Sequence, residues 1–480
     1  MGDYLKKSMI SALTWNSVNV FGLQAVQLII GIILARLLSP EMFGEIGVLF
    51  IFIGLGTILT DGGFGQGLIR KQDAVNKDFS TIFFFNLALS IVLYLLLFWT
   101  SPAIVSFFSL PHIVTPARVL FASVILYSFY IIQFAKLTKE LNYRALALIN
   151  ISSVLLSGVL AIFAAFKGFG VWALVIQQLF FHFFRTIITP FFSRWKPQLV
   201  FTFSTIKSLW KFSIALLGQT TLNVIFANIY VVLIGRFYPI RQVGYFTQAN
   251  KYSETVNAAT QGILSSSTFP IFSKIQDNTE RLKQMYRKLT TSVIMISFPA
   301  VAFLIIAAEP LIVTLISEKW LPSVILFQIL VFAHLLNPVY LINVNLLNAR
   351  GESKNVLNLE IFKKTLIVLS IFICFKFGIN ALLIGLAVSN FISFGVSMFL
   401  VKRSVAHYLR HQILDVLPVL IMVSICASMI YPLQFLTSSY LLQLIIMGIT
   451  FSAIYIAAVR IFYPTKFKEG LMVLRKRMKK

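Results

Sequence analysis

Four polar side chains recur along one segment of a strongly apolar chain. They are Asn250, Glu254, Asn257 and Gln261. Their spacing of i, i+4, i+7 and i+11 places them within an arc of about 60° on an α-helix. Polar groups are costly in hydrocarbon, so such a stripe faces either a water-filled cavity or a hydrogen-bonding seam with another helix. We favour the cavity, because four polar groups exceed what a packing seam needs.

Amide side chains also lie in two other apolar segments, about 200 residues apart in the chain. They are Asn16, Asn19 and Gln27 in the first segment and Gln219, Asn223 and Asn228 in the second. Amides both donate and accept hydrogen bonds, which suits the hydroxyl groups of a sugar. Hydrogen bonding between helices explains them almost equally well. These amides are therefore candidates for the polar lining of a cavity.

Five cations lie within apolar segments or at their outer ends, namely Arg36, Arg118, Arg185, Arg236 and Lys251. A guanidinium binds phosphate through paired hydrogen bonds, and a low-dielectric cleft strengthens that pairing. We therefore predict these cations as substrate-binding residues of a cavity. Arg36 and Arg236 have a simpler alternative, since they stand at matched helix ends where they would cap carbonyl groups or reach toward lipid headgroups. Lys251 would also pair with Glu254, three residues on.

Acidic residues near the apolar segments are few. An ion- or proton-coupled carrier needs a carboxylate that titrates in its cavity, and Glu254 is the better candidate for that role. Asp61 is the second, although it precedes Gly62-Gly63-Phe64-Gly65, a pattern more typical of a tight helix exit. His182 and His334 lack neighbours at metal-ligand spacing. We expect both to be packed within helix bundles, and we expect neither a metal site nor a cofactor.

The elements that position these residues must be membrane-spanning helices. Hydrophobic residues make up 58% of the chain and charged residues 12%, whereas soluble domains are roughly 45–50% apolar. The net charge of +25 is spread over short gaps between apolar runs, which is typical of membrane topology and not of a nucleic-acid-binding face. No outer gap is long enough to fold a catalytic domain. We predict an all-α polytopic membrane protein that is not an enzyme.

A spanning helix needs about 20 mostly apolar residues, and this criterion gives about fourteen candidates. They lie roughly at 12–35, 42–61, 79–101, 114–135, 145–166, 169–191, 212–235, 243–268, 290–309, 322–347, 360–376, 378–401, 413–433 and 439–460. Just before the ninth candidate, Ile275, Leu282, Met285, Tyr286 and Leu289 recur near helical spacing among charges. This pattern predicts an interfacial amphipathic helix.

The distribution of basic residues predicts the orientation. If the N-terminus is cytoplasmic, about three-quarters of the 41 Lys and Arg residues fall in cytoplasmic segments. The positive-inside rule then places both termini in the cytoplasm. We expect the C-terminal LRKRMKK to lie against anionic lipid.

The chain also repeats itself in the same direction. Arg36 and Gly44 in ARLLSPEMFGE match Arg236 and Gly244 in GRFYPIRQVGY. FKGFGVWAL, starting at residue 166, matches FKFGINAL, starting at residue 375. Because six predicted spans separate the matched segments, the halves share one orientation and form a parallel repeat with a cavity at their interface. We predict a six-helix bundle at 1–200, a second at 201–404, and two extra helices with a basic tail at 405–480.

Four collinear segments resemble one family, the Wzx-type polysaccharide flippases of the multidrug/oligosaccharidyl-lipid/polysaccharide (MOP) exporter superfamily. The likeness is greatest to the colanic-acid and teichuronic-acid exporters. The segments are LKKSMISALTWNSVNVFGLQAVQLIIGIILARLLSPEMFGEIGVL, DGGFGQGLIRKQD, FPIFSKIQDNTERLKQMYRKL and FPAVAFLIIAAEPLIVTLISEKW. The likeness extends over nearly the whole chain and depends on the collinear order of these segments, because none of them is a specific signature by itself.

The resemblance implies two six-helix bundles in a V plus two trailing helices, about 14 in all. It implies a flippase of the bacterial cytoplasmic membrane that moves an undecaprenyl-pyrophosphate-linked oligosaccharide to the outer leaflet by alternating access, for O-antigen-like surface polysaccharide. Such flippases are expected to bind the pyrophosphate in a cationic cavity, a general role carried over to the five cations above. A polysaccharide polymerase and glycosyltransferases are the implied protein partners.

Two other functions compete with this interpretation. A small-molecule or cation antiporter of the same superfamily would be expected to line its cavity with acids, whereas the unpaired charge here is mostly positive. A membrane polysaccharide polymerase or ligase would be expected to carry reactive residues on a sizeable outer loop, which the predicted gaps do not provide.

Overall fold

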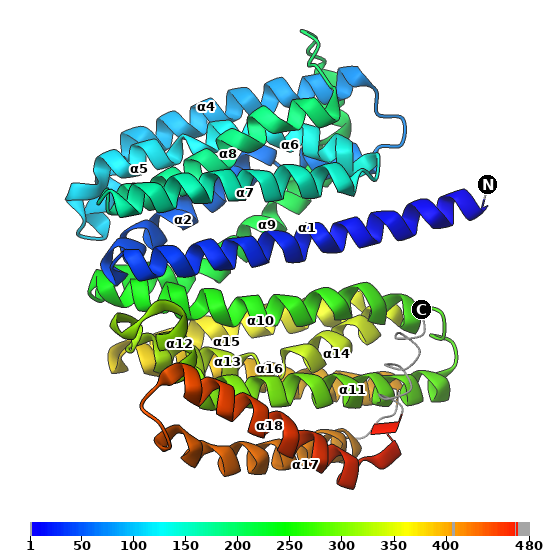
Figure 1. The fold of residues 1–480 in the computed structure, drawn as a ribbon. Coiled ribbons are helices and arrows are strands. Elements are labelled where there is room, and N and C mark those ends of the chain that lie inside the picture. Colours follow the sequence, from blue (N-terminus) through cyan, green and yellow to red (C-terminus); the bar gives the residue numbers. More distant parts are fainter. Residues whose placement is uncertain (1, 406–408, 466, 469–480) are drawn as a thin grey trace. The chain divides into compact units, whose positions relative to one another are not determined.

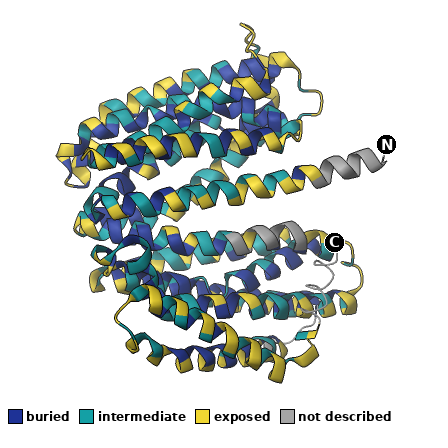
Figure 2. Ribbon diagram, viewed as in Figure 1, coloured by how far each residue is buried: buried dark blue, intermediate teal, exposed yellow. Residues whose placement is uncertain are grey.

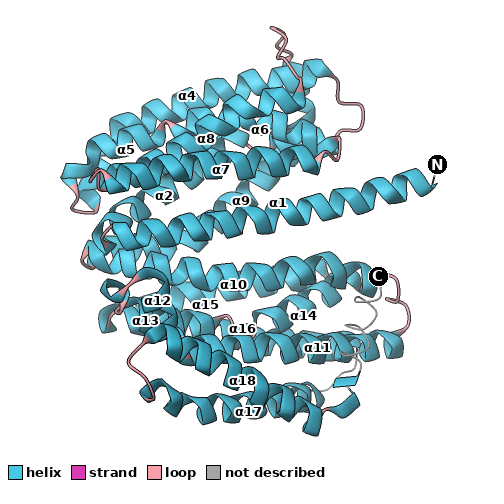
Figure 3. Ribbon diagram, in the orientation of Figure 1, coloured by secondary structure: helices cyan, strands magenta, loops and turns pink. Residues whose placement is uncertain are grey.

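The regular structure of this chain is helical throughout the part that the computed structural model describes. That part comprises residues 2–405, 409–465 and 467–468. Figure 3 shows helices joined by short loops, with no strand among the described residues. The prediction of an all-α protein is confirmed, while the C-terminal LRKRMKK lies outside the described residues.

The chain divides into two compact units, of which the first ends at Thr247 and the second begins at Gln248. The helices of the first unit (Figure 1) are α1 (Gly2–Leu37), α2 (Pro40–Asp61), α3 (Phe64–Arg70), α4 (Asn76–Phe107), α5 (Val114–Phe121), α6 (Ser123–Lys139), α7 (Tyr143–Phe166), α8 (Val171–Ser193) and α9 (Phe203–Phe237). Helix α10 (Ile240–Ser273) begins in this unit and continues into the second. The three-part division expected at residues 200 and 404 stays a prediction.

The second unit contains the remaining helices. They are α11 (Thr279–Ile306), α12 (Ala308–Ile316), α13 (Ser323–Ala333), α14 (Asn337–Ala349), α15 (Ser353–Cys374), α16 (Ile379–Val405), α17 (Leu409–Ile430) and α18 (Tyr440–Phe462). Short 3-10 turns at Pro111–Ile113, Glu318–Trp320, Phe375–Phe377 and Tyr431–Phe435 connect some of them.

Every span expected from the sequence coincides with helix, and twelve helical segments of the described chain are long and apolar enough to cross a membrane. Helices α10 and α15 are not among the twelve, because α10 carries the polar stripe and α15 carries several charges. The chain is a multi-pass membrane protein, and the count of fourteen spans stays a prediction.

Two of the expected spans are broken helices, a feature that was not predicted from the sequence. The fourth is split at Ala122 into α5 and α6, and the tenth is split at His334 to Leu336 into α13 and α14. A break inside a membrane helix frees backbone groups that need other partners, so it is tolerated where protein surrounds it or where it lines a cavity. At the second break, His334 has polar neighbours on α10 and α14.

The prediction of an interfacial amphipathic helix before the ninth span is wrong. Residues from Thr279 onward form the first turns of α11, which continues without interruption to Ile306. Leu282 and Tyr286 are fully buried and pack with Phe272 and Leu346 in one core of the second unit. The apolar periodicity therefore reflects burial against other helices and not contact with a membrane surface.

Within each unit, buried residues line the faces that the helices turn toward one another (Figure 2). In the first unit, Trp195 from the segment between α8 and α9 packs with Phe64, Phe79 and Phe83 in one such core. Large apolar side chains are also exposed on outward faces, Trp99 and Phe372 among them. Exposure of this kind suits a surrounding of lipid hydrocarbon, where it carries no hydrophobic penalty.

Candidate functional site

A chain of polar contacts crosses the first unit from α1 to α8. The amide nitrogen of Asn150 on α7 donates to Asn19 Oδ1 on α1 at 2.8 Å. The hydroxyl of Tyr130 on α6 donates to Asn150 Oδ1 at 3.4 Å. The guanidinium carbon of Arg185 on α8 lies 3.6 Å from the centre of the Tyr130 ring. We call these four residues the first-unit polar chain.

The first-unit polar chain links two residues predicted from the sequence, Asn19 and Arg185, through two residues that were not predicted. Asn150 and Tyr130 are 3% and 1% exposed. Asn150 was detectable in principle, because an amide within an apolar run is costly unless it is paired. Tyr130 gave no such signal, since an aromatic ring is common in an apolar helix.

Arg185 occupies an aromatic pocket and has no acidic partner among the described residues. Its guanidinium carbon lies over Tyr130 and, at 4.9 Å, over Phe181. Its Nε is buried without a hydrogen-bond partner. Cation–π contacts offset part of the cost of burying the charge, but they leave donors that an anionic oxygen would satisfy. Arg185 is thus the best placed of the first-unit cations to bind a phosphate.

His182 lies on α8 about one helical turn before Arg185, and it is buried as expected. Its Nε2 lies 3.2 Å from the amide nitrogen of Gln178, and its ring packs edge-on against Tyr127. The imidazole is therefore held within the bundle by an amide and an aromatic ring.

Two other predicted cations of the first unit contact the C-terminal part of α4, and a third lies at the end of α1. Arg118 donates through Nε to Ser101 Oγ at 3.0 Å and stacks on Phe98. Arg236 donates to the Phe107 carbonyl oxygen at 2.6 Å, so its geometry fits the carbonyl-capping alternative. Arg36 is exposed in the last turn of α1. None of the hydrogen bonds or ring contacts described for these three residues involves Arg185.

Asp61 forms the tight helix exit that the glycines suggested. Helix α2 ends at this residue, and Gly62 and Gly63 follow with φ of 55° and 77°. Asp61 Oδ1 then accepts from the Gly65 N–H at 3.0 Å, at the start of α3. Because the left-handed region favours glycine, the carboxylate and the two glycines together form the turn between α2 and α3.

A cluster of charged and polar groups lies in the second unit around the break between α13 and α14. Glu254 Oε1 on α10 is 3.4 Å from His334 Nε2, and Glu254 Oε2 accepts from the Asn257 amide at 3.4 Å. His334 Nδ1 lies 2.8 Å from the Asn337 amide nitrogen. The pairing of Glu254 with Lys251 is therefore wrong, because the carboxylate is directed toward the helix break while Lys251 is exposed on α10.

The same neighbourhood continues onto α15. Tyr340 on α14 donates to Glu360 Oε1 at 2.9 Å, and Lys363 Nζ lies 4.9 Å from the centre of the Tyr340 ring. We call Glu254, His334, Asn337, Tyr340, Glu360 and Lys363 the second-unit charge cluster. From the sequence, Glu254 was the one member expected to be functional, and His334 was expected only as a packed histidine. His334 is half-buried, and tertiary packing brings it and the other members near Glu254.

A small cavity of about 30 Å³ adjoins His334, lined by Ser253, Asn257 and Ser297 among others. The hydroxyl oxygens of Ser253 and Ser297 are buried without a hydrogen-bond partner in the described structure. A cavity of this size with unsatisfied hydroxyl groups on its wall can hold a single water molecule. The arrangement suits the movement of a proton between a histidine and a carboxylate.

The remaining predicted polar residues differ in their surroundings. Asn257 is buried and Asn250 half-buried, whereas Gln261 is exposed. Asn16 and Gln27 are half-buried on α1, while Gln219 and Asn223 are exposed on α9. Asn228 returns its amide to the Val224 carbonyl of its own helix at 2.9 Å. The stripe on α10 therefore has its buried part near Asn257 and its exposed parts on either side.

Comparison with known proteins shows which protein family this chain matches. The family described as "Polysaccharide biosynthesis protein" matches residues 33–325. The chain is 25% identical to the teichuronic acid biosynthesis protein TuaB of Bacillus subtilis (strain 168), over 73% of each protein. It is 24% identical to the lipopolysaccharide biosynthesis protein WzxC of Escherichia coli (strain K12), over 77% of this chain and 75% of that protein.

A solved structure shares the fold. The inward closed conformation of the lipid II flippase MurJ has a TM-score of 0.75 at 14% sequence identity, covering 94% of this chain and 99% of that one. The similarity in fold thus extends beyond the segment that the family matches.

Proposed function

Because the chain belongs to the family of polysaccharide biosynthesis proteins, we propose that it is a flippase that carries a lipid-linked oligosaccharide across a bacterial membrane. The observation that carries the proposal is the match over residues 33–325, which includes all the helices from α2 to α12. The MurJ-like fold supports it. Transport and not bond-making chemistry is the activity we assign.

The substrate in this proposal is an undecaprenyl-pyrophosphate-linked repeat unit, moved from the cytoplasmic to the outer leaflet of the inner membrane. Arg185 supports this choice, because it is a guanidinium without an acidic partner in the described structure and its Nε has no hydrogen-bond partner. A pyrophosphate supplies oxygens of matching charge and geometry. Arg36, Arg118, Arg236 and Lys251 are further candidates for electrostatic attraction of the same group.

The glycan would be held by amides and hydroxyls, and the lipid tail would remain in the bilayer. Asn19 and Asn257 support this assignment, because each takes part in a network of polar contacts. Alternating access between the predicted bundles at 1–200 and 201–404 would expose the headgroup first to one side of the membrane and then to the other. Both termini belong to the cytoplasmic side in this scheme, and so does the basic tail that follows the two extra helices of 405–480.

We assign energy coupling, as part of the proposal, to Glu254 and His334. The Glu254 carboxylate and the His334 imidazole lie 3.4 Å apart, close enough for a proton to pass between them after a small movement. An intramembrane pair of this kind is a common form of proton relay. Asp61 is the weaker candidate, since its carboxylate already closes the turn before α3.

Reconstitution of the purified full chain tests the transport activity directly. Liposomes would contain a lipid-linked oligosaccharide in both leaflets, and a membrane-impermeant glycosidase would be added outside. We expect the digested fraction to rise from about half, the share in the outer leaflet, toward completion in vesicles that contain the protein.

A parallel series with an organic cation trapped inside the vesicles tests the rival antiporter function. Digestion that stays at the level of protein-free vesicles, together with efflux of the cation, would overturn the proposal. Protein-free vesicles and vesicles with a heat-denatured sample are the controls.

A further inference from the structure

The first unit contains a cavity of about 660 Å³ at one end of its helices. It lies where α4 begins, α6 ends and the segment between α8 and α9 passes. Its lining includes Asn76, Lys136, Lys139, Arg194 and Lys196, with Glu140 as the acid among them. A cavity with four cations and one carboxylate attracts an anion.

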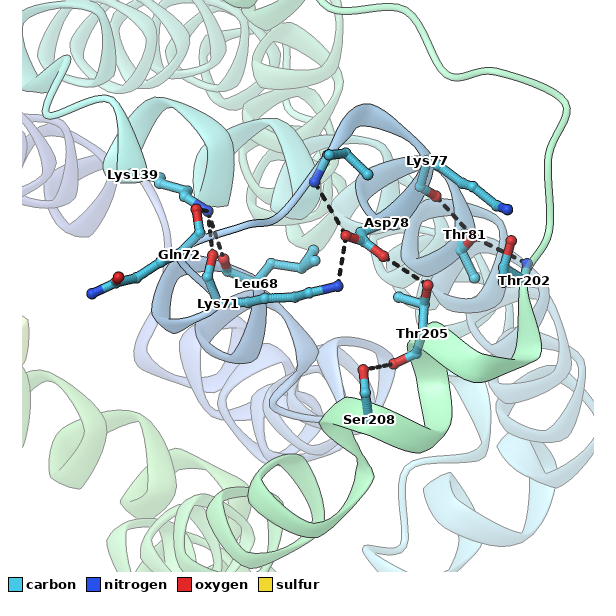
Figure 4. A network of polar contacts seen from close by, with 11 residues as sticks. Leu68, Lys71, Gln72, Lys77, Asp78, Thr81, Lys139, Thr202, Thr205 and Ser208 are labelled. Atoms are coloured by element: carbon cyan, nitrogen blue, oxygen red, sulfur yellow. Dashed lines mark hydrogen bonds and ion pairs between the residues drawn. The ribbon is translucent and has the colours of Figure 1, made fainter.

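Two of the four cations are already engaged. Lys139 donates to the carbonyl oxygens of Lys71, Leu68 and Gln72 at the end of α3, as Figure 4 shows for Lys139 and its neighbours. Lys136 lies 3.8 Å from Glu140. Both contacts are local to this end of the unit.

The other two cations, Arg194 and Lys196, are exposed and have no acidic partner within the described chain. They stand on either side of Trp195, whose indole is buried in a core of the first unit. Because that ring is fixed, the backbone from which the two charged side chains extend is also held beside the cavity.

The backbone that carries these cations is held in place by hydrogen bonds to α4. The Trp195 indole N–H donates to Asn76 Oδ1, and the Gln198 N–H donates to Ser80 Oγ at 3.0 Å.

Farther along, the Thr202 N–H donates to Thr81 Oγ1 at 3.2 Å, and Thr205 donates to the buried Asp78 at 2.7 Å (Figure 4). A binding segment that is already ordered loses less entropy when a ligand binds.

Apolar side chains continue directly from the cationic residues. Leu199 is 93% exposed, and Phe201 and Phe203 are 56% and 70% exposed. The first two lie outside any helix, where exposed apolar groups would be unfavourable in water. They follow the end of span α8 in the sequence, where the edge of a bilayer would let acyl chains cover them.

We propose that this cavity binds the phosphate headgroup of an anionic phospholipid, with the acyl chains against Leu199, Phe201 and Phe203. Arg194 and Lys196 supply the charge that pairs with the phosphate, and the neighbouring apolar residues favour a lipid over a free phosphate ion. Basic pockets between membrane helices bind such headgroups through the same combination of charge and hydrocarbon contact. Arg185 is not among the residues that line this cavity.

Native mass spectrometry of the full chain in detergent tests this proposal. The protein is titrated with phosphatidylglycerol, with zwitterionic phosphatidylethanolamine and with inorganic phosphate. We expect retention of phosphatidylglycerol, and the double variant Arg194→Gln with Lys196→Gln should weaken it about tenfold. The matched control is Lys207→Gln with Lys211→Gln, two exposed cations on the neighbouring α9 outside the cavity lining, which should change retention less than twofold.

Three results would overturn the proposal: equal loss in the two double variants, no loss in either, or displacement of the lipid by inorganic phosphate. Equal loss would mean a diffuse basic surface, and displacement would mean a site for free phosphate. If the Arg194 and Lys196 double variant does not purify as a folded protein, Lys196→Gln alone decides, because that side chain is exposed. A severalfold loss in this single variant supports the site, and unchanged retention refutes it.

Discussion

Gly44 and Gly244, which the sequence repeat aligns, lie against each other at the starts of α2 and α10. A methyl group added to Gly44 would come within 3.1 Å of the Gly244 backbone nitrogen. A methyl group added to Gly244 would collide with the Pro40 carbonyl. The adjacent Glu41 and Arg241 form an ion pair at 3.0 Å. The close approach of these two helix starts therefore depends on glycine, as in other membrane helix crossings.

Gly44→Ala should destabilise the protein, because the added methyl has no space next to backbone atoms that cannot yield. We expect a loss of about 1–3 kcal/mol, seen as a lower midpoint of thermal unfolding in detergent. Gly218→Ala is the matched control, since a methyl on Gly218 in α9 meets nothing within 4 Å; it should be neutral or stabilising by about 0.4–1 kcal/mol. Equal midpoints for the two variants would show that the crossing tolerates a side chain.

Asp78→Ala should also destabilise the protein. This carboxylate is 5% exposed and accepts from Lys71 Nζ at 2.8 Å, the Val75 N–H at 3.1 Å and Thr205 at 2.7 Å. Its removal leaves these donors unpaired, at a cost of about 1–3 kcal/mol. Limited proteolysis should then cut the segment at 194–202 faster, because one of its anchors is lost. Asp73→Ala, which removes an exposed carboxylate nearby, should leave both stability and proteolysis unchanged.

Arg185→Glu should reduce polymer export at least roughly tenfold in a strain that lacks its own flippase, because a charge-assisted hydrogen bond to the substrate would be replaced by repulsion. Arg185→Lys should retain part of the activity, since it keeps the charge but not the planar stack on Tyr130 and Phe181. Lys167→Glu, an exposed reversal in the same unit, is the control. Membrane levels of each variant are measured in parallel, and full export by Arg185→Glu would remove this residue from the substrate path.

Glu254→Gln and His334→Gln should each abolish acceleration of transport by a proton gradient in vesicles. Neither side chain could then exchange a proton with its neighbour across the 3.4 Å contact. Transport without a gradient should persist at the wild-type rate, which separates coupling from substrate binding. Glu280→Gln, an exposed carboxylate at the start of α11, serves as the control. A wild-type rate that does not respond to a proton gradient would remove the proposed role of both residues.

The helices of this protein follow from local sequence. Hydropathy over about 20 residues predicts a spanning helix without reference to the rest of the chain, and every expected span is helical. The exit after Asp61 was likewise local, because two consecutive glycines permit the left-handed backbone found there. Local patterns were less informative at the breaks near Ala122 and His334, where neighbouring segments replace the missing helical contacts.

The partners of the functional candidates were decided by tertiary structure. Asn19 meets Asn150 at 131 residues' separation, and Glu254 meets His334 across 80 positions of the sequence. The sequence of an apolar helix indicates only weakly which of its faces are buried in protein and which contact lipid, since both surroundings favour the same side chains. Its rotation about its own axis, and hence which polar groups meet, is set by packing against other helices. The sequence by itself therefore determined the membrane-spanning class and the residue types available to bind the proposed anionic, sugar-bearing substrate, while packing decided which of them meet.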